Sequence, residues 1–163
     1  MPELHDEPDL LRLAATIDAW AARELGSNPM LLAVEHDRVE RRWLVRLAGE
    51  DKEFITLWLT LRERTLLHEA HVLPAPEEGH REVFEHCLRA NQRMFGMAFA
   101  IGLEDAIYLR GAVPLEDLDE DELDRITGSS WQYVEQHFRA LLRTGFASRL
   151  AAMEAKAAQN EGG

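Results

Sequence analysis

The residues that most resemble a chemical site lie in PLEDLDEDELDR, residues 114–125, where three aspartates alternate with other residues. This spacing begins the twelve-residue calcium loop of an EF-hand, which also needs glycine at position six and glutamate at position twelve. Counted from Asp117, those two positions hold Glu122 and Gly128. The loop therefore lacks both its sharp turn and its bidentate ligand.

The same stretch fits the start of a helix. Asp119 is placed as the N-cap, and Glu122 follows three residues later in capping-box register. Acidic residues fill the first turn, where the helix dipole favours them. Apolar residues then recur every three or four positions, and Gly145 is placed to end the helix near Thr144. We predict a helix cap here and no metal site.

The histidines and the single cysteine do not form a second site. His68 and His71 fall in a predicted strand, where a three-residue spacing puts side chains on opposite faces. His80 and Cys87 lie roughly 10 Å apart along a predicted helix. No glycine-rich phosphate loop, GxSxG elbow or zinc-type cysteine pair occurs in the sequence. We predict no catalytic, cofactor-binding or metal-binding residue, although the many carboxylates leave an acid–base pair open.

Composition places the chain among soluble, single-domain proteins. Its 163 residues can bury a core without a metal or disulfide, and the lone Cys87 cannot form an internal disulfide. The net charge of −12 argues against nucleic-acid binding, and the arginines of DRVERRWLVR are expected at the solvated edge of a strand. The chain has no membrane-spanning apolar run, and its acidic N-terminus does not resemble a secretory signal. We expect a cytoplasmic protein that binds neither nucleic acid nor membrane.

Hydrophobic spacing predicts the first half of the fold. Apolar residues at helical spacing indicate a helix over residues 9–24, with Asp9 as its N-cap. The period then changes to two in RRWLVRLA, EFITLWLTLR and TLLHEAHVL, which indicates an antiparallel meander. The meander has three strands, or four if residues 31–36 pair. FITLWLT gives the sheet a second, half-apolar face.

The second half contains two helices around a hairpin. A helix begins near Pro76 and ends at Gly96, a hairpin whose loop includes Gly102 follows, and the helix capped by Asp119 completes the domain. The predicted order is α-β-β-β-α-β-β-α, an α+β arrangement with an antiparallel sheet packed by helices.

Several stretches resemble a known protein family. PAPEE, AIYLRG running into PLEDLDEDELDR, LLRTGFASR and the strands of GEDKEFITLWLTLRERTL are similar to the actinobacterial branch of the YbjN family. The resemblance covers roughly residues 10–150. We therefore expect one YbjN-like domain over residues 1–150 and a frayed or disordered tail over residues 151–163.

The resemblance implies a fold and a kind of function. YbjN proteins are similar in fold to type III secretion chaperones, which pair as homodimers and hold an extended segment of a client protein. Membership implies a bacterial, non-enzymatic role in partner binding or regulation, often described as sensory transduction regulation. It brings no accepted catalytic residue. A homodimer is also expected because the predicted apolar surface exceeds what one small domain needs to cover.

Two functional hypotheses remain. The favoured hypothesis is a homodimeric protein-binding module, chaperone-like or regulatory, with Trp20, Trp43, Trp58 and Phe54 as the partner-binding candidates. For any single tryptophan, a place in the core is the simpler interpretation. The alternative is a small-molecule sensor or enzyme with a pocket between the sheet and the second helix. Its polar groups are drawn from a separate set: Asn91, Arg93, His68 and Tyr108.

Overall fold

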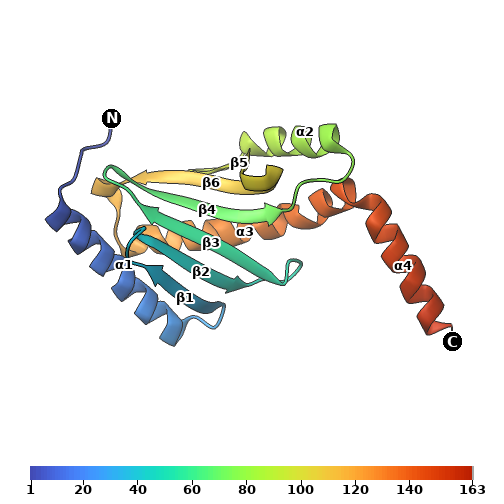
Figure 1. Cartoon of the computed structure of the whole chain (residues 1–163), viewed down its shortest axis with the longest axis horizontal. Coiled ribbons are helices and arrows are strands. Elements are labelled where there is room, and N and C mark those ends of the chain that lie inside the picture. The colour runs from blue at the N-terminus through green and yellow to red at the C-terminus, as the bar shows by residue number, and fades with distance from the viewer. Residues whose placement is uncertain (163) are drawn as a thin grey trace.

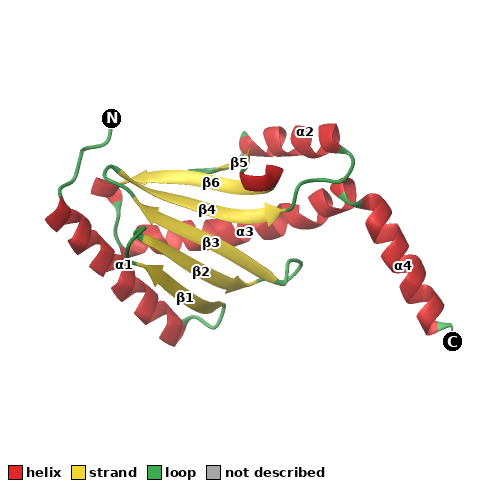
Figure 2. Ribbon diagram, viewed as in Figure 1, coloured by secondary structure: helices red, strands yellow, loops and turns green. Residues whose placement is uncertain are grey.

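The computed structural model describes residues 1–162, which build a six-stranded antiparallel sheet with helices beside it (Figure 1, Figure 2). The strand order is β1-β2-β3-β4-β6-β5, so β1 and β5 are the two edges. This arrangement confirms the predicted α+β fold class. The elements in chain order are α1 (Glu7–Ser27), β1 (Leu31–Asp37), β2 (Arg42–Ala48), β3 (Phe54–Leu61), β4 (Thr65–Leu73), α2 (His80–Asn91), β5 (Ala98–Ile101), the short η1 (Leu103–Asp105), β6 (Ile107–Pro114), the short η2 (Leu115–Asp117), α3 (Glu120–Gly145) and α4 (Ala147–Glu161).

Alternation along the strands gives the sheet two different faces. In β2 and β3, Trp43 pairs with Leu59 and Val45 pairs with Leu57, and all four side chains are fully buried. We call this side the covered face, because α1, α2 and α3 pack against it. The intervening residues, such as Leu44 and Trp58, point to the opposite side, which we call the open face. In Figure 1, α3 runs behind the strands and the open face is toward the viewer.

Three tryptophans join the helices to one another and to the sheet. The indole N–H of Trp43 donates to Asp18 of α1 at 2.8 Å. The indole N–H of Trp20 on α1 donates to Asp124 of α3, also at 2.8 Å. Each indole is thus buried with its one polar group satisfied, and these bonds fix α1 against both the sheet and α3. The third, Trp131 of α3, donates to the backbone oxygen of Ala48 at the end of β2.

The structure settles the number of strands in the meander and corrects two predicted helix starts. Residues 31–37 do pair with β2, so the first half has four strands. The prediction that Asp9 caps α1 is wrong, because Asp6 caps it by accepting the Asp9 amide N–H at 3.0 Å. The predicted start of α2 near Pro76 is also wrong. Gly79, with φ of 59°, makes a left-handed turn that delays the helix until His80.

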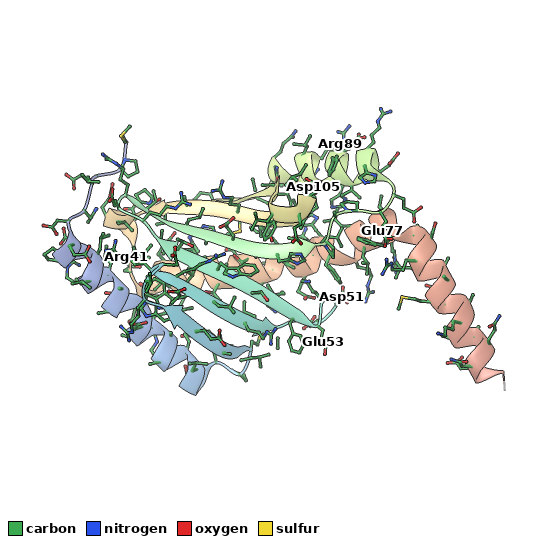
Figure 3. The ribbon with its side chains drawn as sticks, in the orientation of Figure 1. Arg41, Asp51, Glu53, Glu77, Arg89 and Asp105 are labelled. Atoms are coloured by element: carbon green, nitrogen blue, oxygen red, sulfur yellow. The ribbon has the colours of Figure 1, made fainter. Side chains whose placement is uncertain are left out.

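The chain continues as α4, which projects from the body of the molecule (Figure 1). Glu77 of the β4–α2 loop lies beside the start of α4 (Figure 3). Its carboxylate pairs with Arg149 at 2.6 Å. The neighbouring Glu78 accepts the backbone N–H of Ser148, also at 2.6 Å. Every described side chain after Leu150 is exposed. The domain boundary at residue 150 and the fraying of the tail stay predictions.

Candidate partner-binding surface

The open face carries a band of aromatic side chains with arginines stacked on them. Trp58 of β3 lies at the centre, between Leu44 of β2 and Glu69 of β4 in the strand register. The Tyr108 ring centroid lies 6.3 Å from that of Trp58 in a tilted arrangement. The guanidinium carbon of Arg42 lies 5.5 Å from the Trp58 ring centroid, within cation–π range.

The band continues at both ends. The guanidinium carbon of Arg46 lies 5.1 Å from the Phe54 ring centroid, near the β2–β3 hairpin. At the other end, His71 packs edge-on against Tyr108 with ring centroids 5.4 Å apart. Trp58 is half-buried, whereas Phe54 is 42% exposed. Aromatic surface is therefore available to a partner across β3, β4 and β6.

The charge of the open face differs from that of the whole chain. Three arginines share it, namely Arg42, Arg46 and Arg110, in a chain whose net charge is −12. Three carboxylates, those of Glu35, Asp37 and Glu69, balance the arginines on this face, and Glu69 is already engaged by Arg110 at 3.5 Å. A guanidinium that stacks on a ring keeps its N–H edge free for a carboxylate or carbonyl oxygen. The face thus combines apolar contact area with free hydrogen-bond donors.

A second apolar surface lies at the other side of the molecule, where α2 meets the edge strand β5. We call it the α2–β5 patch and define it by Phe84, Leu88 and Ile101. Leu88 is 67% exposed and Ile101 is 56% exposed. Together they border a groove of about 350 Å³, whose lining residues are Phe84, Cys87, Leu88, Phe99, Ala100, Ile101 and Ile107.

The four predicted partner-binding residues fall into two groups. Trp20 and Trp43 are only 1% and 0% exposed, because they fill the space between α1, α3 and the covered face. Trp58 and Phe54 lie on the open face. The structure therefore brings only the second pair together on an accessible surface. Partner binding by these residues stays a prediction, and the proposal below is built on Trp58 and Phe54.

The polar residues of the alternative pocket do not converge. Asn91 is committed to the backbone of Phe99, accepting its N–H at 2.7 Å and donating to its carbonyl oxygen at 3.2 Å. His68 lies buried on the covered face, while Tyr108 is on the open face. Arg93 borders a different cavity, between α2 and α3. The groove between α2 and the sheet is instead lined by apolar residues.

Two buried titratable side chains are held in their neutral forms. Burial, assisted by the nearby Arg125 charge, lowers the pKa of His68 to about 4. Neither ring nitrogen of His68 has a hydrogen-bond partner within residues 1–162. Burial also raises the pKa of the Cys87 thiol to about 11, so this thiol is protonated at neutral pH and is a poor nucleophile.

The acidic stretch of residues 116–122 leads into the start of helix α3. The side chain of Asp119 accepts the backbone N–H of Glu122 at 2.8 Å, which confirms the predicted N-cap of α3. The carboxylate of Glu122 binds Arg125 one turn later. In the described part of the chain, no three side chains of histidine, cysteine, aspartate or glutamate gather in a way that could hold a metal ion.

Sequence reasoning missed part of the open face and one contact between helices. Tyr108 follows the strict alternation of AIYLRG, so its place opposite His71 could have been inferred from β6 pairing with β4. The contact is between His86 of α2 and His137 of α3, whose Nε2 and Nδ1 atoms lie 2.9 Å apart. No local pattern signals that pair, because it depends on how the two helices pack.

The fold is that of type III secretion chaperones. One similar structure is described as "Crystal Structure of the ExsC-ExsE Complex", with a TM-score of 0.58, 19% identity, and coverage of 79% of this chain and 96% of the other. A second is "Structure of the HopA1-SchA Chaperone-Effector Complex", with a TM-score of 0.57, 14% identity, and coverage of 83% and 98%. At such identities the likeness concerns the fold alone.

The chain belongs to the YbjN family, whose model is described as "Putative bacterial sensory transduction regulator" and matches residues 15–143. Similar curated proteins include Rv0487 of Mycobacterium tuberculosis, 36% identical over 107 residues, and ML2442 of Mycobacterium leprae, 34% identical over 109 residues. Those matches cover 66% and 67% of this chain but only 58% and 59% of the relatives' length. The predicted family membership is thereby confirmed.

Within residues 1–162, no helix combines the length and the apolar character that crossing a bilayer requires. A location in the cytoplasm stays a prediction.

Proposed function

We propose that this chain is a non-enzymatic protein-binding module, chaperone-like or regulatory, that works as a homodimer and holds a segment of a partner protein on the open face. The observation that carries the proposal is the band of arginine-stacked aromatic rings on a sheet face that no helix of the described chain covers. The family and the chaperone-like fold support the same class of function.

The open face suits an extended segment better than a small compact ligand. Its aromatic residues are spread over three neighbouring strands and do not surround one cavity. An extended peptide presents alternating side chains, so apolar residues can contact Trp58 and Tyr108 while acidic ones meet Arg42 and Arg46. Such a peptide needs no pocket, only a surface of this length.

The α2–β5 patch is the proposed dimer surface. Leu88 and Ile101 are largely exposed on neighbouring elements, and a two-fold axis through this region buries the same residues of both copies. Although β5 is an edge strand, Asn91 occupies the backbone N–H and carbonyl group of Phe99 at that edge, so the two copies are expected to meet through side chains and not through strand pairing. The patch is separate from the open face, so dimerisation leaves the partner surface accessible.

Affinity capture from the native host tests partner binding. The tagged wild-type chain is compared with a Phe54→Ser/Trp58→Ser double variant and with a control, Val39→Ser. Val39 is 90% exposed in the β1–β2 turn, so the control removes apolar surface away from the open face. We expect one partner to be recovered at near-equal amount with the wild type and the control, and lost with the double variant.

Two results would contradict this part of the proposal. One is a partner that remains bound to the double variant as strongly as to the wild type. The other is recovery of the chain alone from all three samples. Unfolding midpoints of the variants are measured in parallel, so that loss of binding is not confused with loss of folding.

Light scattering tests the dimer. We expect a mass of twice the 18.6 kDa chain at micromolar concentration. Leu88→Glu places a charge in the patch and should yield monomers, whereas Glu82→Lys changes an exposed residue of the same helix that lines neither groove beside the patch and should leave the dimer intact. A monomeric wild type, or a Leu88→Glu variant that still dimerises, would exclude this interface.

A further inference from the structure

A cavity of about 360 Å³ lies between α2 and α3, on the helical side of the molecule and away from the open face. Its volume is at the small end of the range for ligand pockets, about 300–1,000 Å³. It belongs neither to the proposed peptide surface nor to the α2–β5 patch. Its lining residues are His86, Arg89, Ala90, Gln92, Arg93, Met94, Tyr133, Gln136 and His137.

Both walls of this cavity present polar groups at helical spacing. On the α2 side, His86 and Arg89 are three positions apart on one side of the helix, and Arg93 follows in the turn just after the helix ends at Asn91. On the α3 side, Tyr133 and His137 are four positions apart and face them. Hydrogen-bond donors from two helices therefore converge on one space.

The charge of the cavity is opposite to that of the chain. Among the described residues, none that lines it is acidic, although the chain carries a net charge of −12. Arg93 makes no ion pair within residues 1–162, so its guanidinium group has no internal partner. Arg89 is held at the rim by Glu85, with 2.8 Å between the nearest nitrogen and oxygen atoms.

The histidine pair adds one hydrogen-bond donor without adding a fixed charge. The 2.9 Å bond between Nε2 of His86 and Nδ1 of His137 uses one nitrogen of each ring. Of the outer nitrogens, Nδ1 of His86 and Nε2 of His137, the neutral pair leaves one as a donor and the other as an acceptor, and the described part of the chain gives neither a further hydrogen bond. His137 is fixed by Phe99, which packs edge-on at 5.3 Å between centroids. The pair thus forms a polar wall of the cavity.

We propose that this cavity binds a phosphate group, with Arg93 as the main charged contact and the His86–His137 pair and Tyr133 as hydrogen-bonding groups. Arginine matches phosphate oxygens in geometry and charge, and a partly enclosed site strengthens such contacts. The phosphate comes either from a small free ligand or from a phosphorylated protein segment. The site rests on the α2–α3 cavity alone and does not depend on the proposed function.

Calorimetric titration with defined probes tests the site. The probes are pyrophosphate, a phosphoserine peptide and the same peptide without phosphate, at constant ionic strength and pH 7. Arg93→Ala removes the unpaired charge from the cavity. Arg81→Ala removes the same charge from an exposed position of α2 that does not line it. We expect a single site that Arg93→Ala weakens about tenfold or more and Arg81→Ala leaves unchanged.

Each outcome decides the proposal. Pyrophosphate binding assigns the site to a small free anion, and binding of only the phosphopeptide assigns it to a phosphorylated partner. Failure of both probes to bind the wild type overturns the proposal. Equal weakening by Arg93→Ala and Arg81→Ala also overturns it, because it indicates general attraction between charges. The unfolding midpoint of Arg93→Ala, measured without probe, verifies that the variant is folded.

Discussion

The buried His68 should make this protein sensitive to mild acid. Its side chain is fully buried on the covered face, opposite Gly111 of β6. Burial and the Arg125 charge lower its pKa from 6.5 to about 4 in the folded chain. As the pH falls below about 6.5, His68 binds a proton in the unfolded chain but stays neutral in the folded chain. Stability is therefore lost between about pH 6.5 and pH 4.

The two pKa values set the size of this effect. One pKa unit corresponds to about 1.4 kcal/mol, so the full difference is worth about 3.4 kcal/mol once the pH is below 4. Between pH 7.5 and pH 5.0 the same linkage predicts that His68 alone lowers the free energy of unfolding by about 2 kcal/mol. This is a large fraction of the roughly 5–15 kcal/mol by which domains are stable.

Urea unfolding at the two pH values measures the effect. Other histidines and carboxylates titrate over the same interval, so the wild type is compared with a His68→Leu variant. Leucine has a similar volume but does not titrate, so the difference between the two proteins isolates the effect of His68. The wild type should lose about 2 kcal/mol more than the variant on going to pH 5.0. Equal losses in the two proteins would refute the inference that His68 is buried in its neutral form.

Three further predictions concern stability and reactivity. Asp119→Ala removes the N-cap of α3 and should cost about 1 kcal/mol in urea unfolding, with calcium having no effect on the wild-type midpoint. Gly111→Ala places a Cβ 2.2 Å from the Gly96 carbonyl oxygen, so we expect the free energy of unfolding to fall by about 1–3 kcal/mol in the same assay. An unchanged midpoint would contradict the close approach of β6 to Gly96. Cys87 should react with a thiol reagent only after denaturant is added, because it is buried and its pKa is about 11; fast reaction in buffer would show that α2 opens readily.

The sheet and its two faces could be predicted from the sequence because strand alternation is a local signal. Trp43 lies between Arg42 and Leu44 in RRWLVRLA and shares its buried face with Val45 and Leu47, as the period of two predicts. In β3 both faces carry apolar residues, so the pattern alone does not say which face the helices cover. The partner-binding candidates were chosen by residue type. They therefore included two core residues, Trp20 and Trp43, together with Trp58 and Phe54 of the open face.

The helix starts were harder to place because several residues suit a cap equally well. Asp6 and Asp9 are both good N-caps, and Pro8 in the first turn was the signal that favoured Asp6. The delay of α2 depends on a left-handed Gly79, which the sequence permits but does not require. The cavity between α2 and α3 joins residues about 50 positions apart and follows from tertiary packing alone.

Site-specific photo-cross-linking in the native host tests most directly whether the open face holds a partner. A photoreactive residue replaces Thr56 on the open face, next to Arg46 in the register, and in a second sample it replaces the exposed Gln132 of α3. We predict one cross-linked protein from position 56, absent when Trp58 and Phe54 are replaced by serine, and none from position 132. A partner trapped only from position 132, or trapped equally well from position 56 in the serine variant, would contradict binding on the open face.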